Sequence, residues 1–306
     1  MEKQIDESLF IKKAPSVIIR PSRKSIPERN GEVTICMGDA HIGYREKEPF
    51  HDERALLLGI IAVRQLCPDN IVLLGDMLDL PAMSRFSQRS DWQNSTQDSI
   101  DRYHLYLSEL RANAPEANII AIHGNHEMRQ PNYIQKNAAE LLGIKRANIQ
   151  KELGVLTLQY LCRYDELNIK CVDGYPNATY WLEDDLKCVH GSNVSKGGSN
   201  AAKYLNQEMT STIYGHTHRL ELANKTISTR DGYKIISAAS PGCLAKIDGT
   251  VPGHKHSIDG NNKTVFNAEN WQQGLLVIFH DKNHHNIQPL TIDNDGINIF
   301  DKKYSK

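Results

Sequence analysis

Short apolar runs that each lead into a polar cluster restrict the fold of this chain more than any other feature. The runs are four or five residues long, rich in β-branched side chains, and followed within two residues by a glycine. They cover residues 33–37, 70–74, 119–122 and 211–214. Such runs are typical of buried strands. We therefore expect the polar clusters just beyond the carboxyl ends of strands, where α/β folds position their chemistry.

Helical patterns lie between these runs, at residues 53–67, 99–112, 134–142 and 199–209. Strands that alternate with helices predict sheets that are covered by helices. We therefore predict the α/β class, with residues 31–306 forming one domain. Residues 1–30 are predicted to be a basic N-terminal arm, because residues 11–30 hold six basic residues and three prolines. A solvated tail is the interpretation that we favour for this arm; a segment that tracks phosphates is the alternative.

The polar clusters bring together two carboxylates, an amide oxygen and several imidazoles. They contain Asp39, His41, Asp76, Asn125, His126, His190, His216 and His218. Oxygen and imidazole donors without cysteine suit manganese, iron or zinc better than calcium or a thiolate zinc site. Without a metal, such a buried network would leave polar groups unpaired at a cost of several kcal/mol. A carboxylate can bridge two cations held about 3.5–4 Å apart, and Asp76 is the natural bridge.

The order of the clusters, Asp-x-His, Gly-Asp, Gly-Asn-His-Glu, His and Gly-His-x-His, resembles the calcineurin-like metallophosphoesterase superfamily. The resemblance covers roughly residues 31–245, and residues 271–275 with the apolar run after them resemble its closing strand. It implies a four-layer α-β-β-α sandwich in which two mixed sheets are flanked by helices. Mre11-type nucleases and other phosphodiesterase-like members are the branches that this chain resembles.

The resemblance also implies the role of each residue in the clusters. It assigns Asp39, His41, Asp76 and His218 to one metal, and Asp76, Asn125, His190 and His216 to the other. We expect two divalent metal ions, with manganese as the first choice and iron, zinc or nickel as alternatives. His126 would be the catalytic residue, as the general acid for the leaving group. Some members have lost ligands and act as scaffolds, but this chain keeps every one, so we expect an enzyme.

The substrate is predicted from what the chain lacks. Phosphoprotein phosphatases of the superfamily extend the second motif to Gly-Asp-x-x-Asp-Arg-Gly, whereas here Leu80 and Pro81 follow Asp79. Because the phosphatase arginine is missing, we expect a phosphodiester substrate, such as DNA, RNA or a cyclic nucleotide. Arg129 could supply the missing charge. A phosphomonoesterase or protein phosphatase, and a metal-bearing scaffold without turnover, remain the alternatives.

Charge does not favour a dedicated nucleic-acid-binding protein, since the formal net charge is −1 and the pI is about 6.9. The inserted segment at residues 80–98 softens this objection, because Arg85, Arg89 and Trp92 could bind phosphate and stack on a base. Its aromatic residues could equally anchor the insertion to the core. Asp79 could support a metal ligand, although we favour ordinary helix capping for it.

Other histidines match the motifs less well. His254 and His256 also spell Gly-His-x-His, but they follow Val251 and Pro252 instead of a β-rich run, so we reject them as ligands. The histidines of an apparent C-terminal hairpin are expected to be solvated surface residues. They are His280, His284 and His285.

We expect neither a membrane-spanning segment nor a secretory signal. Its longest apolar stretch, residues 56–63, is far too short to cross a bilayer. Six cysteines without zinc-type spacing are typical of reduced thiols, so a cytoplasmic location is expected.

Overall fold

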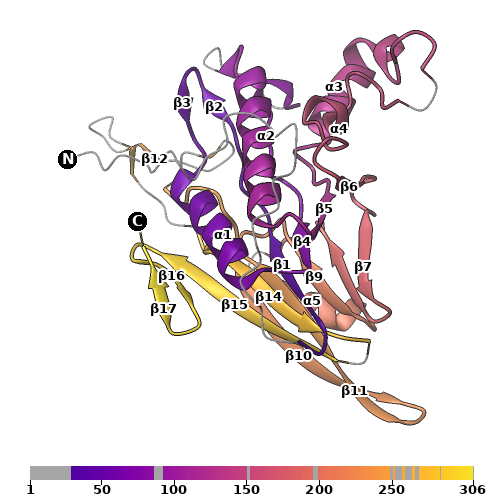
Figure 1. Ribbon diagram of the computed structural model, residues 1–306, viewed down its shortest axis with the longest axis vertical. Coiled ribbons are helices and arrows are strands. Elements are labelled where there is room, and N and C mark those ends of the chain that lie inside the picture. Colours follow the sequence, from indigo (N-terminus) through magenta and orange to yellow (C-terminus); the bar gives the residue numbers. More distant parts are fainter. Residues whose placement is uncertain are drawn as a thin grey trace.

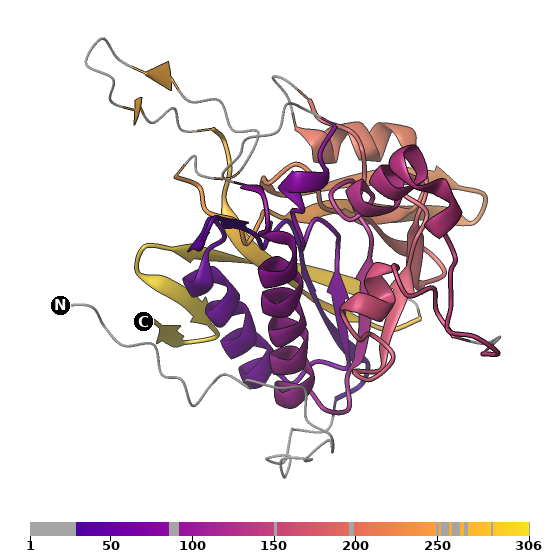
Figure 2. The ribbon, with the colours of Figure 1, turned by 90° about the horizontal axis from the view of Figure 1, so that it is seen from above.

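Two large sheets between helices make up the part of the chain that the computed structural model describes (Figures 1 and 2). The described residues are 29–85, 92–149, 152–195, 199–248, 251, 257–258, 264–265, 269–282 and 284–305. The strands are β1 (Glu32–Met37), β2 (Tyr44–Arg45), β3 (Glu48–Pro49), β4 (Asn70–Leu73), β5 (Asn118–Ile122), β6 (Ile169–Val172), β7 (Thr179–Glu183), β8 (Leu186–Val189), β9 (Ser211–Tyr214), β10 (Leu220–Thr229), β11 (Gly232–Pro241), β12 (Ser257–Ile258), β13 (Thr264–Val265), β14 (Gln273–His280), β15 (His285–Asp293), β16 (Gly296–Ile299) and β17 (Lys302–Tyr304). The helices are α1 (Glu53–Leu66), η2 (Pro81–Met83), α2 (Thr96–Asn113), α3 (Arg129–Asn137), η4 (Ala139–Leu141), α4 (Leu158–Leu161) and α5 (Asn200–Gln207).

Both large sheets are mixed. The first has the order β17-β16-β15-β14-β1-β4-β5-β6, and the second has the order β10-β11-β9-β8-β7. In the first sheet β1, β4, β5 and β6 run parallel, while β14 pairs antiparallel with β1. In the second sheet β8, β9 and β11 run parallel, and β7 and β10 pair antiparallel at the edges. The parallel strands in each sheet end on the same side, so the loops that follow them gather at one edge.

Apolar side chains define four layers. Helices α1 and α2 lie side by side over one face of the first sheet and pack there against buried residues such as Ile35 and Leu73 (Figure 2). The opposite face of that sheet meets the second sheet through Val72, Ile120 and Ile213, among others. Helix α5 covers the outer face of the second sheet. The predicted α-β-β-α sandwich with two mixed sheets is confirmed.

The helices begin and end close to the predicted positions, with one exception. Helix α1 begins where the side chain of Asp52 accepts hydrogen bonds from the backbone N–H groups of Arg54 (2.9 Å) and Ala55 (3.0 Å). The helix expected over residues 134–142 instead begins at Arg129 and is followed by the short η4 turn. Pro131 lies in the first turn of α3, where a proline needs no N–H partner, so it does not delay the helix.

Several predictions fall on residues outside the described ranges. They are the basic arm up to residue 28, Arg89, and the rejected pair His254 and His256. The prediction that His280 lies on the solvated surface is wrong, because His280 is 4% exposed and belongs to the interior. Among the described residues, no helix combines the length and apolar character needed to cross a membrane.

Candidate metal centre

The predicted ligands lie in loops that leave the carboxyl ends of strands of both sheets. In the first sheet Asp39 follows β1, Asp76 follows β4 and Asn125 follows β5. In the second sheet His190 follows β8, and His216 follows β9. Donor atoms of these loops form three groups whose members lie within 4.8 Å of one another. The groups are Asp39 with His41 and His218, His41 with Asp76 and His126, and Asp76 with His190 and His216.

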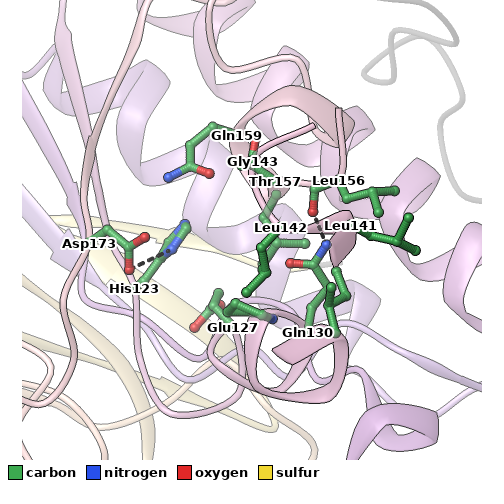
Figure 3. Close-up of a pocket in the computed structure, with 13 residues that line it drawn as sticks. His123, Glu127, Gln130, Leu141, Leu142, Gly143, Leu156, Thr157, Gln159 and Asp173 are labelled. Atoms are coloured by element: carbon green, nitrogen blue, oxygen red, sulfur yellow. Dashed lines mark hydrogen bonds and ion pairs between the residues drawn. The ribbon is translucent and has the colours of Figure 1, made fainter. Parts of the chain in front are cut away.

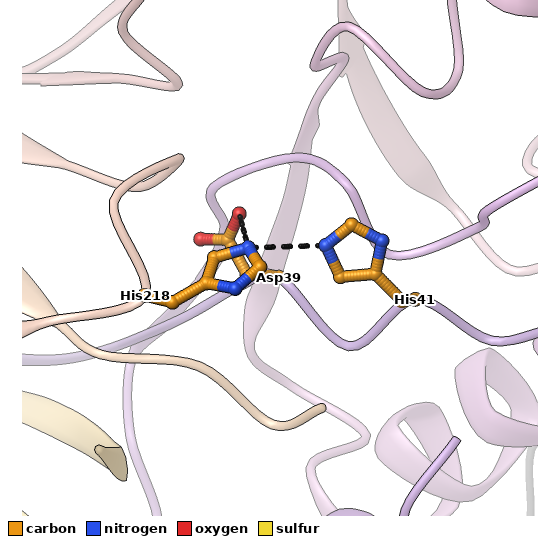
Figure 4. A group of neighbouring side chains, drawn as sticks. All are labelled: Asp39, His41 and His218. Atoms are coloured by element: carbon orange, nitrogen blue, oxygen red, sulfur yellow. Dashed lines mark hydrogen bonds and ion pairs between the residues drawn. The ribbon is translucent and has the colours of Figure 1, made fainter. Parts of the chain in front are cut away.

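The first group consists of Asp39, His41 and His218 (Figure 4). His218 Nε2 lies 3.3 Å from Asp39 Oδ1 and 3.1 Å from His41 Nε2. Burial and the neighbouring His126 lower the pKa of His41 to about 4, so its imidazole is neutral at pH 7. Its Nδ1 lies 2.9 Å from Asp79 Oδ2, and a neutral ring donates there, which leaves a lone pair on Nε2 facing His218. This convergence of lone pairs suits a cation.

The second group consists of Asp76, His190 and His216, with Asn125 beside it. His190 Nδ1 lies 2.7 Å from the carbonyl oxygen of Leu74, which only accepts, so Nδ1 carries a proton. Its Nε2 lies 3.3 Å from Asp76 Oδ2 and 3.2 Å from Asn125 Oδ1. Burial alone would lower the pKa of His190, but Asp76 and Asp39 raise it to about 10. The oxygens around this nitrogen therefore attract positive charge, which a divalent ion would supply.

Asp76 belongs to the second group and also shares a group with His41 and His126. Its Oδ1 accepts a hydrogen bond from the backbone N–H of His126 at 2.8 Å, and its Oδ2 faces His190. Burial would raise the pKa of Asp76, but His126 and His190 hold it well below the usual range. Asp76 is therefore an ionised carboxylate at the position where a bridging ligand is expected. Its role as the bridge stays a prediction.

The loops hold five of these side chains on left-handed backbone. The φ angles are 51° at Asp39, 49° at His41, 49° at Asp76, 69° at His216 and 56° at His218. Such conformations cost about 1–3 kcal/mol each outside glycine and persist only where the surroundings enforce them. Strain of this kind clusters at functional sites.

Glycine is needed where these loops touch. Gly75 has a φ of +95°, and a Cβ there would lie 2.7 Å from the backbone nitrogen of Gly124. A Cβ on Gly124 would lie 2.3 Å from Asp76 Oδ1. The glycines of the Gly-Asp and Gly-Asn-His motifs therefore let two ligand loops approach each other.

Asp79 supports the centre, and the prediction that it caps a helix is wrong. The residue at the N-terminus of η2 is Leu80, which makes no side-chain cap. Asp79 is fully buried, and its carboxylate contacts His41, His126 Nδ1 at 3.1 Å, and Arg129. Burial would raise the pKa of Asp79, but His126 and Arg129 hold it well below the usual range. One carboxylate thus orients two imidazoles of the centre.

Glu127 joins two of the ligand loops, a role that the sequence did not reveal. Its Oε2 accepts hydrogen bonds from the backbone N–H groups of Asp76 and Gly124, both at 2.9 Å. Its Oε1 accepts one from Leu78 at 3.0 Å, and the residue is 2% exposed. The only sequence signal for this role was an acidic residue directly after Gly-Asn-His.

His126 lies against the first group without being one of its predicted ligands. Its ring centroid is 4.4 Å from that of His41. Burial would lower the pKa of His126, but the carboxylates of Asp76 and Asp79 raise it. An imidazole whose pKa is raised by neighbouring carboxylates suits the role of a general acid.

Comparison with known proteins decides the family. The sequence model of the family described as "Calcineurin-like phosphoesterase" matches residues 33–220, more than half of the chain. The chain is a calcineurin-like phosphoesterase. Two curated relatives are the Gene 54 proteins of Mycobacterium phages D29 and L5, which are 25% and 24% identical over 248 residues. Each alignment covers 77% of this chain and 86% of the phage protein.

Some solved structures are similar to this chain at low sequence identity. Vps29 from Entamoeba histolytica, complexed with zinc, is 14% identical with a TM-score of 0.37, covering 87% of this chain and 96% of that one. The phosphoesterase Yfce from E. coli is 13% identical with a TM-score of 0.31, covering 85% and 100%. A dimetal phosphatase from Danio rerio is 10% identical with a TM-score of 0.32, covering 84% and 95%. The family and the donor groups together indicate a divalent-metal site in this phosphoesterase.

The predicted substrate residues of this phosphoesterase lie in different surroundings. Arg129 lies at the centre, where its guanidinium pairs with Asp79 and reaches His126 Nε2 at 3.2 Å. Arg85 is exposed and Trp92 is half-buried, on the segment between η2 and α2. Their contact with substrate stays a prediction.

A pocket of this phosphoesterase shares Glu127 with the ligand loops (Figure 3). His123, Gln130, Leu141, Leu142 and Asp173 are among its lining residues. Burial would lower the pKa of His123, but contacts with Asp173 and Cys171 raise it to about 10. None of the predicted ligands is among the described residues that line the pocket, so it is distinct from the metal centre.

Proposed function

We propose that this phosphoesterase hydrolyses phosphodiesters at a dinuclear metal centre. The observation that supports the proposal is that Asp76 shares one donor group with His41 and His126 and another with His190 and His216. The donor set, oxygen and imidazole without sulfur, fits divalent transition metals. When bound, two such ions lower the pKa of a coordinated water and neutralise charge on phosphoryl oxygens. We propose manganese as the metal, with iron, zinc or nickel as alternatives.

The residues of the chain would divide the remaining work. Asp39, His41, Asp76 and His218 would hold one ion, and Asp76, Asn125, His190 and His216 the other. His126 would donate its proton to the leaving oxygen. Asp79 would fix the orientation of the His41 and His126 rings. Glu127 would hold together the loops that carry Asp76 and Gly124.

A diester is favoured over a monoester by the charge at the centre. A monoester dianion carries one more negative charge than a diester and needs a further positively charged side chain to bind it. The arginine that extends the second motif in the phosphatases is absent here. Arg129 is close enough to serve, but its guanidinium is already paired with the buried Asp79. The net positive charge left for a substrate is therefore modest, which suits the single charge of a diester.

Nucleic acid or a nucleotide is the diester that we propose. Arg85, Arg89 and Trp92 remain candidates for contacts with phosphate and base. The six cysteines are all free in the structure, which supports a reducing compartment such as the cytoplasm.

Turnover of bis-p-nitrophenyl phosphate and p-nitrophenyl phosphate, each with Mn²⁺, tests the proposal. We expect the diester to be hydrolysed faster, and a chelator to abolish both activities. Faster hydrolysis of the monoester would make the protein a phosphomonoesterase. If folded protein that retains two metal ions hydrolyses neither compound, the enzyme proposal fails and a metal-bearing scaffold takes its place. Zn²⁺, Fe²⁺ and Ni²⁺ in parallel reactions would test the choice of metal.

A further inference from the structure

Each donor group of the centre has an aromatic ring against one of its imidazoles. The Trp271 ring lies 4.1 Å from the His218 ring between centroids, at an interplanar angle of 69°. The Tyr175 ring lies 5.7 Å from the His190 ring, at 63°. His218 belongs to the group with Asp39, whereas His190 belongs to the group with Asp76 and His216. The two rings thus flank different halves of the centre.

The fold holds Trp271 in this place from both sides. The backbone N–H of the next residue, Gln272, donates to the carbonyl oxygen of His218 at 2.9 Å. The ring also packs against a small buried cluster of Cys243, Ala245 and Val251. Trp271 nevertheless keeps part of its surface exposed. Its position is therefore set by the structure, while part of the residue is open to solvent.

Tyr175 reaches the other half from the loop between β6 and β7. The neighbouring turn is closed by a hydrogen bond from the N–H of Asn177 to the carbonyl oxygen of Gly174, at 3.0 Å. Tyr175 is half-buried. Burial raises the pKa of its hydroxyl, and the nearby carboxylate of Asp76 raises it further. Its ring is therefore at the centre and partly open to solvent.

We propose that Trp271 and Tyr175 are stacking platforms for a phosphodiester that carries a nucleobase on each side of the scissile phosphate. The inference rests on the proposed function, because it assumes that the phosphate is held between the two donor groups. In a dinucleotide or a single strand, each phosphate has one base before it and one after it. A ring on each side of the centre matches that arrangement, whereas a cyclic nucleotide has only one base to stack.

The charge of the chain favours stacking as the means of recognition. Proteins that hold nucleic acid mainly through phosphates carry a clear basic excess and lose affinity steeply with salt. This chain has a formal net charge of −1. Stacking on aromatic side chains accepts any base, because every base has a π face, and the stacking contact itself pairs no charges. We therefore expect the KM for a dinucleotide to change little between low and moderate salt.

Substrates that lack one base test the proposal. The set is dithymidine monophosphate, its two analogues with the base removed from the 5′ or the 3′ nucleoside, and methyl p-nitrophenyl phosphate. Trp271→Ala and Tyr175→Ala should each raise the KM for the dinucleotide about tenfold, or 1.4 kcal/mol. Each variant should have no effect on the one analogue that lacks its base. Trp271→Phe and Tyr175→Phe should restore most of the loss, because a ring remains.

Matched controls and metal analysis separate stacking from support of the centre. Trp181→Ala and Tyr233→Ala remove exposed rings of the same kinds from β7 and β11 and should leave every KM unchanged. The inference is overturned if the alanine variants slow all four substrates equally or lose metal. An oligothymidylate bound more tightly than the dinucleotide would identify a strand as the substrate; equal KM values would identify the dinucleotide.

Failure of the proposed function gives a different result. If the wild-type protein with two metal ions hydrolyses no diester, the binding of dithymidine monophosphate, measured by calorimetry, tests the stacking proposal independently of catalysis. Weaker binding to Trp271→Ala and Tyr175→Ala than to the control variants would support it. Equal binding, or no binding to any of these proteins, would overturn it.

Discussion

The metal centre and the region around His280 both place buried histidines next to acidic residues, and the two regions treat these histidines differently. At the metal centre His41 and His190 each use Nδ1 for a contact within the protein and turn Nε2 toward other ligand atoms. Away from the centre, His280 has both nitrogens satisfied. Its Nε2 lies 2.7 Å from the hydroxyl of Thr34, and its Nδ1 lies 2.8 Å from a Glu183 oxygen.

The difference shows what separates a structural histidine from a candidate ligand. His280 lies on β14 and contacts Thr34 on β1 and Glu183 on β7, so its side chain links the two sheets by hydrogen bonds. A metal would have no free lone pair to bind there. At the centre each of these two imidazoles uses one nitrogen for a contact that fixes the ring and directs the other nitrogen toward the ligand atoms. Metal ligands with a supporting partner have this arrangement. Burial and acidic neighbours alone do not distinguish the two regions.

The largest expected effect comes from the carboxylate between the donor groups. Asp76→Asn keeps the size of the side chain but removes its charge, so the two ions would lose the ligand that we propose they share. We expect activity at background level and metal content near one ion per chain or none, measured by elemental analysis. His256→Ala should leave the metal content unchanged. Two tightly held ions in Asp76→Asn would show that the bridge is assigned wrongly.

A large but more selective effect is expected at His126. His126→Asn should keep both metals and lower kcat about 10²–10⁴-fold, the usual contribution of a general acid. The loss should be smaller for p-nitrophenyl esters than for alkyl esters, since nitrophenolate leaves without a proton. Equal losses on both classes of leaving group would exclude the acid role.

An intermediate effect is expected from the residue that orients the imidazoles. Asp79→Asn should weaken metal binding about 10–100-fold, as is typical for partners of metal ligands. Because Asp79 raises the pKa of His126, the variant should also move the alkaline limb of the kcat profile to lower pH. Metal titration and a pH–rate profile measure the two effects. An unchanged profile would mean that Asp79 does not act on His126.

The smallest effect on catalysis is expected at the structural histidine. His280→Ala leaves Thr34 and Glu183 without their partner, so the free energy of unfolding should fall by about 1–3 kcal/mol. Metal content and kcat of the folded protein should not change. Urea unfolding and elemental analysis test this, with the exposed His284→Ala as the control. Loss of metal from His280→Ala would remove the distinction between the two regions.

The main lines of the fold and of the candidate site follow from the sequence because both depend on local signals. An apolar β-rich run that ends at glycine predicts a strand and the loop after it, so Asp39, Asp76 and Asn125 are located correctly without a structure. The order of the clusters then identifies the superfamily. Helix α1 is predicted almost to the residue because its apolar pattern is continuous in sequence.

Other features depend on contacts that a linear pattern does not contain. Asp79 resembled a cap because its partners His41 and Arg129 are 38 and 50 residues away. The polar partners of His280 lie on other strands, so a position in a hairpin suggested the surface. Tyr175 lies in no motif, and Trp271 belongs only to the stretch that resembles the closing strand, so only the tertiary structure brings these two rings to the centre.

The left-handed backbone at Asp39, Asp76 and His216 implies a conflict between durability and function. Glycine at any of these positions would relieve the conformational cost that a side chain with a Cβ incurs there. It would also delete a proposed ligand. Random mutagenesis selected only for heat resistance should therefore drift toward glycine at His216, whereas selection for catalysis should hold it fixed. At Asp39 and Asp76 the loss of the hydrogen bonds that their carboxylates accept from the backbone N–H groups of His216 and His126 would oppose this drift.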